Sequence, residues 1–182
     1  MRTLVLGGIR SGKSRWAEDA IAGAVPAGQP VCYLAPGPTG AGDAAWADRV
    51  AEHRGRRPGH WSTVETDDIA GHLRGSPDTP TLVDDLGTWL TGTLDRLDGW
   101  AGGSVAAPVR DTIDAMLAAV GDFDSTLVLV SPEVGLAVVP ATASGRRFAD
   151  ELGTLNQRVA ELCDRVVLVV AGQAVPIKPS GT

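Results

Sequence analysis

Cysteine and asparagine are scarce in this sequence, and their scarcity excludes several kinds of site. Its 182 residues include two cysteines, Cys32 and Cys163, which lie in separate apolar runs without the CxxC or Cys/His spacing of a zinc site. We therefore expect buried free thiols and no disulfide framework. The single asparagine, Asn156, stands in the sequence NQR, so the Asn-Lys-x-Asp loop with which GTP-switch proteins read guanine is absent. A GTPase of that kind is excluded.

The sequence also lacks a positive net charge and a long hydrophobic run. Its formal charge of −6 removes the broad basic field that nucleic-acid binding normally needs, so we expect no nucleic-acid partner. No apolar run approaches the roughly 20 residues of a membrane-spanning helix, and the first predicted strand reaches its glycine turn too soon for a signal-peptide core. We expect a cytoplasmic protein with no membrane span.

The chain is long enough, and at 43% hydrophobic residues apolar enough, for one domain over residues 1–182. Apolar strand-like runs alternate with stretches of helical periodicity, without an internal repeat or a linker. Because the predicted strands are apolar throughout, we expect a mostly parallel sheet covered on both faces. The predicted strands are 3–7, 31–35, 60–66, 81–85, 125–131, 165–172 and 175–178, and the predicted helices are 14–24, 43–54, 88–97, 109–120 and 148–162.

A phosphate-binding loop is predicted between the first strand and the first helix, in the sequence GGIRSGKS. Only two lysines occur among the 16 basic residues, and one of them is Lys13 in this segment. In this pattern Lys13 bridges the β- and γ-phosphates and Ser14 ligates Mg²⁺, whereas the flat guanidinium of arginine could not replace the compact ammonium. The backbone N–H groups that would surround the phosphate belong to Gly7, Gly8, Ile9, Arg10, Ser11, Gly12 and Lys13.

A chance glycine-rich turn is the alternative interpretation of this segment. The strand, loop and helix that the P-loop motif requires are all predicted around it, which favours phosphate binding. The expected fold class is therefore α/β, a three-layer P-loop nucleoside triphosphate-binding fold with a mostly parallel central sheet.

An acidic pair at the end of the strand 81–85 completes the predicted metal site. P-loop proteins usually place an acid at the end of another strand near the metal. Asp84 is the first choice for this Mg²⁺ ligand, with Asp85 behind it. The alternative is that both acids merely start a surface turn.

The stretch EHRGRRPGHW at 52–61 concentrates two histidines and three arginines. Arginines such as Arg54 and Arg57 are suited to hold polyphosphate oxygens, and a histidine beside them could attack a phosphorus as a covalent nucleophile. A plain solvated face is the alternative, and spacing alone does not decide between the two.

Several motifs occur in the same order as in one known family of enzymes. They are GGIRSGKSRWAE at 7–18, H-R-x-x-R-P-x-H-W-x-T-x-E at 53–65, LVDDLGTWL at 82–90, EVG at 133–135 followed by Pro140, and RFADELGTLNQ at 147–157. Together they resemble the bifunctional adenosylcobinamide kinase / adenosylcobinamide-phosphate guanylyltransferase of cobalamin biosynthesis. The resemblance runs from Arg2 to about Lys178.

The resemblance implies two reactions and a nucleophile. Enzymes of this family phosphorylate the aminopropanol hydroxyl of adenosylcobinamide with ATP or GTP, and then transfer GMP from GTP to the new phosphate through a guanylylated histidine. The family's nucleophile lies eight residues before the tryptophan of the HW pair, which places this role on His53. His60 is expected to orient or to pack. A homotrimer, with each active site near a subunit boundary, is also implied.

Four departures from the family pattern bear on the contacts to the nucleotide base and the corrinoid. Pro132 replaces a frequent asparagine, Asp43-Ala44-Ala45-Trp46 replaces Asp-x-Glu-Met, Asp85 replaces a cysteine, and the 140–145 loop lacks a polar asparagine. Three functions stay open at this point. They are the bifunctional enzyme, a single-activity P-loop small-molecule kinase that does not use His53, and a nucleotide-binding regulator without transfer chemistry.

Overall fold

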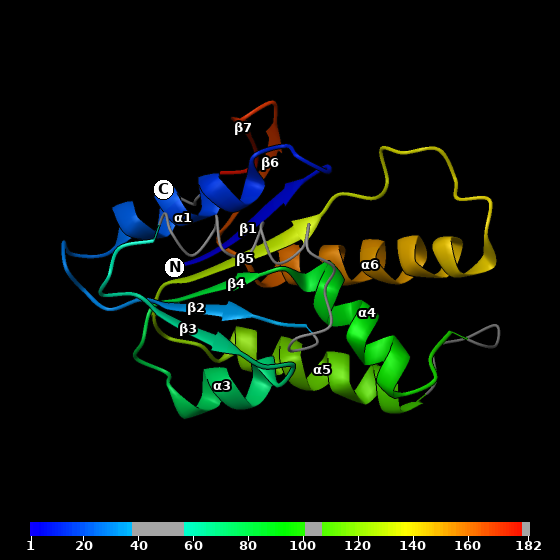
Figure 1. Ribbon diagram of the computed structural model, residues 1–182, viewed down its shortest axis with the longest axis horizontal. Helices are drawn as coiled ribbons and strands as arrows, with labels where there is room; N and C mark the ends of the chain where they lie inside the picture. The colour runs from blue at the N-terminus through cyan, green and yellow to red at the C-terminus, as the bar shows by residue number, and fades with distance from the viewer. Residues whose placement is uncertain (38–56, 101–106, 180–182) are drawn as a thin grey trace.

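The computed structural model describes residues 1–37, 57–100 and 107–179 (Figure 1). Its strands are β1 (Arg2–Gly7), β2 (Cys32–Ala35), β3 (Ser62–Glu65), β4 (Thr81–Asp84), β5 (Leu127–Pro132), β6 (Arg165–Val170) and β7 (Gln173–Lys178). Its helices are α1 (Lys13–Ala24), α3 (Ile69–Gly75), α4 (Leu86–Arg96), α5 (Ala107–Gly121) and α6 (Ala143–Leu162). None of these described helices is long and apolar enough to span a membrane.

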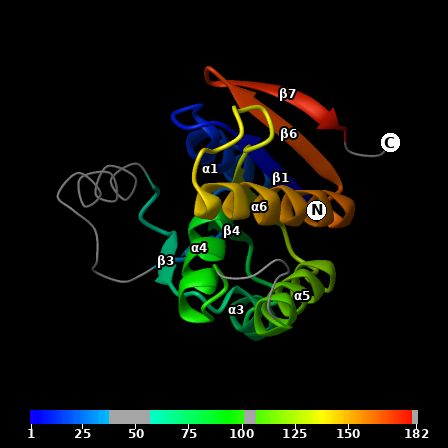
Figure 2. The same ribbon diagram turned by 90° about the vertical axis from the view of Figure 1, so that its right-hand side faces the viewer.

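The described strands form one seven-stranded sheet in the order β3-β2-β4-β5-β1-β6-β7. Every neighbouring pair is parallel except β6 and β7, which form an antiparallel hairpin at one edge; Figure 2 shows β3 and this hairpin far apart. β1 lies near the middle, where Leu4 is paired with Leu129 of β5 and with Val166 of β6. The loop that follows β1 therefore lies at the carboxyl edge of the sheet, between the ends of β5 and β6.

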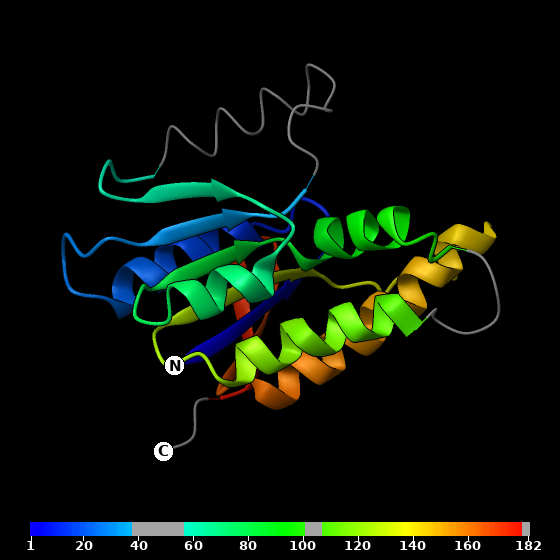
Figure 3. The ribbon, with the colours of Figure 1, turned by 90° about the horizontal axis from the view of Figure 1, so that it is seen from below.

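Helices cover both faces of the sheet (Figure 3). α1 packs on one face, where Ala17 and Ile21 contact a cluster that includes Val5 and Val167. The helices α3, α4, α5 and α6 pack on the other face around a larger core that includes Trp89. This arrangement confirms the predicted three-layer α/β fold with a mostly parallel sheet.

Some element boundaries differ from the sequence-based expectation. The strand predicted at 165–172 ends at Val170, because Ala171 and Gly172 adopt left-handed conformations that reverse the chain. α6 begins at 143 instead of 148, since the hydroxyl of Thr142 caps it by accepting a hydrogen bond from the N–H of Gly145. α3 is a helix that was not predicted. The helix predicted at 43–54 lies outside the described residues.

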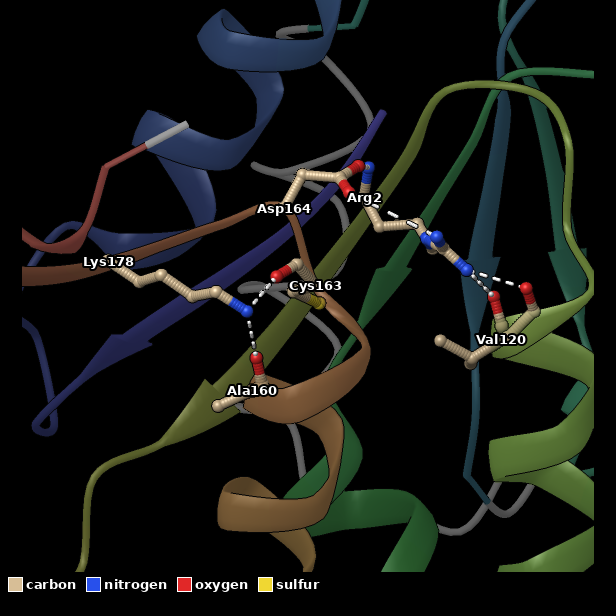
Figure 4. A network of polar contacts seen from close by, with 7 residues as sticks. Arg2, Val120, Ala160, Cys163, Asp164 and Lys178 are labelled. Carbon is tan, nitrogen blue, oxygen red and sulfur yellow. Dashed lines mark hydrogen bonds and ion pairs between the residues drawn. The ribbon is translucent and has the colours of Figure 1, made fainter. Parts of the chain in front are cut away.

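The C-terminal strand ties the end of α6 to the sheet (Figure 4). Lys178 Nζ donates hydrogen bonds to the carbonyl oxygens of Ala160, at 3.1 Å, and Cys163, at 2.6 Å. A lysine at this position satisfies carbonyls that the helix leaves unpaired and complements the negative end of the helix dipole.

Burial raises the pKa of the Cys163 thiol to about 12, so this thiol stays protonated. Both cysteines, including Cys32, are buried and free, as predicted.

Candidate nucleotide-binding site

The segment between β1 and α1 forms a tight loop at the carboxyl edge of the sheet (Figure 1). Arg10 and Gly12 adopt left-handed backbone conformations, with φ angles of 56° and 92°. A backbone hydrogen bond of 3.3 Å joins the N–H of Ser11 to the carbonyl of Gly8, and the N–H of Gly172 donates to the carbonyl of Ser11 at 2.8 Å. The loop is thus held both by its own backbone and by the β6–β7 turn.

Close packing requires glycine at two positions of this loop. A Cβ atom at Gly7 would lie 2.8 Å from the carbonyl oxygen of Val169, and one at Gly12 would lie 3.2 Å from the Cα atom of Gly172. Gly12 also has a positive φ, which residues with a Cβ atom rarely adopt. Gly8 has open space around it, so here glycine leaves the outer side of the loop uncovered.

The first turn of α1 presents backbone N–H groups without a side-chain cap. The N-cap residue is Gly12, and no acidic residue occurs in the first turn. Such unpaired N–H groups, at the positive end of the helix dipole, favour an anion. Lys13 Nζ lies 3.5 Å from the carbonyl oxygen of Gly8, and the buried hydroxyl of Ser11 has no hydrogen-bond partner among the described residues. The structure therefore brings the predicted residues 7–14 together in one strand, loop and helix.

Asp84 ends β4 at the same edge of the sheet as the loop. It is in register with Val130 of β5, which in turn is in register with Val5 of β1. Since adjacent strands lie about 4.8 Å apart, the backbone of Asp84 is about 10 Å from β1. The Oδ2 atom of Asp84 accepts a 2.7 Å hydrogen bond from the hydroxyl of Tyr33 on β2.

Asp85, the second choice for the metal ligand, has a different role. Its Oδ1 atom accepts a 2.7 Å hydrogen bond from the backbone N–H of Thr88, which makes it the N-cap of α4. A carboxylate at this position pairs a free N–H group and complements the helix dipole. Asp85 therefore starts the helix α4, and Asp84 remains the candidate ligand.

The oxygen atoms of Ser14 and Asp84 fit a magnesium ion by their chemistry, because Mg²⁺ prefers oxygen donors and usually takes one or two carboxylates plus substrate phosphates. Among the residues that the structure describes, no group of three or more His, Cys, Asp or Glu side chains could hold a metal by itself.

Arg57 lies in a packed position beside α1 and β2. Its guanidinium carbon lies 3.2 Å from the centre of the Tyr33 ring, and its Nε atom forms an ion pair with Glu18 at 3.6 Å. Its Nη1 atom donates a 3.0 Å hydrogen bond to the hydroxyl of Thr63 on β3. The side chain is 7% exposed. Arg57, which the sequence predicts as a phosphate ligand, therefore contacts Tyr33, Glu18 and Thr63 in the structure.

Sequence reasoning missed Glu18 and Tyr33. Glu18 lies on the buried face of α1, and Tyr33 is 4% exposed in an otherwise aliphatic strand. In both cases the sequence shows a polar side chain at a position where the pattern of the helix or strand predicts an apolar one, and this mismatch could have indicated a functional residue. Burial, followed by the negative charge of Asp84, raises the pKa of Tyr33 above its ordinary value, so its hydroxyl stays protonated and acts as a donor.

The histidine stretch is described only from Arg57 onward, so His53 and Arg54 lie outside the described residues. His60 is exposed in a turn closed by a 3.0 Å hydrogen bond from the N–H of Trp61 to the carbonyl of Pro58. Trp61 packs against the core beneath α1. The packing role expected of His60 therefore falls to its neighbour.

Comparison with known proteins decides the family. The sequence model described as "Cobinamide kinase / cobinamide phosphate guanyltransferase" matches residues 3–177. The chain belongs to this family. It is 42% identical to the bifunctional adenosylcobalamin biosynthesis protein CobP of Pseudomonas aeruginosa over 186 residues, which cover 98% of each chain. It is 36% identical to the protein CobU of Salmonella typhimurium over 193 residues, which cover 98% of this chain and all of that one. The resemblance drawn from the motifs is confirmed.

One position that departs from the pattern of the cobinamide kinase / guanyltransferase family lies beside the loop at residues 7–14. Pro132 ends β5 directly beside Gly7, and its carbonyl accepts a 3.0 Å hydrogen bond from Nδ2 of Asn156 on α6. The Oδ1 atom of Asn156 accepts a 2.6 Å hydrogen bond from the hydroxyl of Ser131. The single asparagine of the chain thus fixes the strand end that adjoins the loop.

Proposed function

We propose that this chain catalyses both reactions of its family within one domain, residues 1–182. It phosphorylates adenosylcobinamide with ATP or GTP, and then transfers GMP from GTP to adenosylcobinamide phosphate, which gives adenosylcobinamide-GDP for cobalamin biosynthesis. The observation that carries this proposal is the family match over residues 3–177. The assembled loop at residues 7–14 supports it, because both reactions need a held triphosphate.

The loop supports the kinase reaction through charge and position. The N–H groups of residues 7–13 and the ammonium of Lys13 hold the β- and γ-phosphates. The substrate hydroxyl oxygen attacks the γ-phosphorus, the bond from this phosphorus to the β-phosphate oxygen breaks, and the hydroxyl proton leaves to solvent. Ser14 and Asp84 would hold Mg²⁺, which when bound supplies positive charge for the phosphate oxygens.

His53 is the proposed nucleophile of the second reaction. Its neutral imidazole attacks the α-phosphorus of GTP, so that a P–N bond forms and the P–O bond to pyrophosphate breaks. Lys13, Arg54 and the loop amides stabilise the departing pyrophosphate. A phosphate oxygen of the substrate then attacks the same phosphorus, and cleavage of the P–N bond restores the histidine.

GTP labelled at the α-phosphate tests the transferase. We expect acid-labile, base-stable label on the protein, its loss in His53→Ala and its retention in the matched control His60→Ala. Tight GTP binding without label would contradict the transferase and favour the single-activity kinase. Label from the γ-phosphate of GTP or ATP on adenosylcobinamide separates either enzyme from a nucleotide-binding regulator.

We also propose that the enzyme is a cytoplasmic homotrimer that binds nucleoside triphosphates and a corrinoid, and no nucleic acid. The trimer follows from the family resemblance, and the net charge of −6 supports the absence of a nucleic-acid partner. Light scattering tests the assembly, since a trimer has three times the chain mass of 18.8 kDa. A particle of the single-chain mass would contradict it.

A further inference from the structure

A chain of polar contacts runs from α1 to the candidate metal ligand. Glu18 on α1 pairs with Arg57, the guanidinium of Arg57 stacks on the ring of Tyr33, and the hydroxyl of Tyr33 donates to Asp84. These side chains come from α1, the turn before β3, β2 and the end of β4. The sheet order makes this possible, because β2 lies between β3 and β4.

The hydrogen bond from Tyr33 restricts the orientation of the Asp84 carboxylate. It is 2.7 Å long and is made in a part-buried setting, where a hydrogen bond to a charged acceptor is strong. A carboxylate has about four lone-pair positions, so the hydrogen bond from Tyr33 is compatible with metal ligation by the same group. Partners that fix a ligating side chain in this way commonly influence metal affinity.

Arg57 and Glu18 in turn hold the tyrosine ring. The ion-paired side chains are 7% and 11% exposed, so removal of either one takes a charge partner from a mostly buried charge. The guanidinium carbon lies over the ring, 3.2 Å from its centre, and the cation–π attraction is strongest when water is excluded. The ring therefore has little freedom to turn its hydroxyl away from Asp84.

We propose that Tyr33 is a positioning residue that orients Asp84 toward the metal ion of the nucleotide complex, and that Arg57 and Glu18 keep Tyr33 in place. The proposal rests on the proposed function, which assigns Asp84 to Mg²⁺. Arg57 then supports the site through Tyr33 and does not contact the phosphates.

Direct metal binding separates this role from a general effect on the fold. Paramagnetic Mn²⁺ replaces Mg²⁺, and its affinity for the full-length protein with a non-hydrolysable GTP analogue is measured by electron paramagnetic resonance. Nucleotide affinity is measured separately in EDTA by calorimetry. We expect Tyr33→Phe, which removes only the hydroxyl, to weaken Mn²⁺ binding about tenfold or more and to leave nucleotide affinity in EDTA unchanged.

Two further variants serve as the control and as the reference for loss of the metal ligand. Thr81→Val is the matched control, because it removes a buried hydroxyl from the same strand as Asp84 that donates to the carbonyl of Thr79. It should bind Mn²⁺ like the unmodified protein. Asp84→Asn should weaken Mn²⁺ binding at least as much as Tyr33→Phe, since it removes the charge of the ligand itself.

The outcomes distinguish this inference from the proposed function. If Asp84→Asn weakens Mn²⁺ binding and Tyr33→Phe does not, the positioning role is overturned and the metal role of Asp84 stands. If Asp84→Asn has no effect, the metal role itself is wrong, and the inference is overturned with it. The inference is also overturned if Tyr33→Phe loses as much nucleotide affinity in EDTA as it loses Mn²⁺ affinity. Such a result indicates a damaged loop.

Arg57→Met supplies a second test, which also holds if Tyr33→Phe fails to fold. The substitution keeps an unbranched side chain and removes the cation over the ring. We expect Mn²⁺ affinity to fall by roughly two- to fivefold, in line with the loss of one cation–π contact, and nucleotide affinity in EDTA to stay unchanged. A large loss of nucleotide affinity in EDTA would assign Arg57 directly to the phosphates and overturn its anchoring role.

Discussion

The two lysines of the chain differ in what surrounds them. Lys13 starts α1 and its ammonium lies over the loop near the carbonyl of Gly8, whereas Lys178 binds two carbonyls at the far end of α6. The first position suits a phosphate ligand and the second a helix cap. Substitution of each lysine by alanine therefore gives a matched pair of variants in which activity and stability should separate.

In Lys13→Ala we expect both activities to fall by about 100-fold or more, because the variant lacks a charge placed for the phosphates, with no change in the melting temperature. In Lys178→Ala we expect both activities to be retained. The free energy of unfolding should fall by about 1 kcal/mol, and the melting temperature by about 2–4 °C. Product formation and thermal unfolding by circular dichroism measure the two effects. Normal turnover in Lys13→Ala would refute its assigned role.

At the scale of elements, Asn156 joins α6 to the end of β5. It is 6% exposed, and its side chain bonds Ser131 and Pro132 at once. Asn156→Ala should destabilise the protein by about 1–3 kcal/mol, because it leaves a buried hydroxyl and a carbonyl without partners. Urea unfolding measures this change. The exposed neighbour Gln157→Ala is the control, and equal stability of both variants would contradict the role given to Asn156.

The long helices and the strands could be predicted from periodicity and apolar runs, and the short helix α3 could not. α5 and α6 present apolar residues at helical spacing over many turns, and β1, β5 and β6 are apolar runs. α3 has seven residues, too few for a periodic pattern to emerge, and it buries only Ile69 and Leu73. Its start depends on a cap, since the Asp68 side chain accepts a hydrogen bond from the N–H of Gly71. Tertiary packing therefore decides this helix.

At the scale of the whole molecule, one part of the candidate site is local in sequence and the other part depends on contacts between distant residues. The loop at residues 7–14 is local in sequence, so its residue types and their spacing sufficed to predict it. The contacts among Glu18, Arg57, Tyr33 and Asp84 join residues up to 51 positions apart and depend on the order of strands in the sheet. No spacing rule contains that order. The arginine-rich stretch at 52–61 therefore predicted a phosphate ligand at Arg57 and could not predict its contacts with Glu18 and Tyr33.

Partial burial of an imidazole contributes to the pH dependence of the free energy of unfolding. His72 on α3 lies with its Nε2 atom 3.2 Å from the Sγ atom of Cys32 on β2. Burial lowers the pKa of His72 below its ordinary value of about 6.5, and burial raises the pKa of the Cys32 thiol. Both partners are therefore uncharged at neutral pH. The folded state disfavours protonation of this imidazole, which the unfolded chain accepts freely.

We therefore expect the contribution of His72 to the free energy of unfolding to be fully present above pH 6.5 and to decline as the pH falls from there toward the lowered pKa of folded His72. The sign follows from linkage, because below pH 6.5 the unfolded chain binds a proton that the folded chain does not. Urea unfolding at pH 7.5 and pH 5.5 measures the decline, which should be smaller in His72→Gln. The exposed His60→Gln should keep it. An identical decline in His72→Gln would show that other groups cause the acid sensitivity.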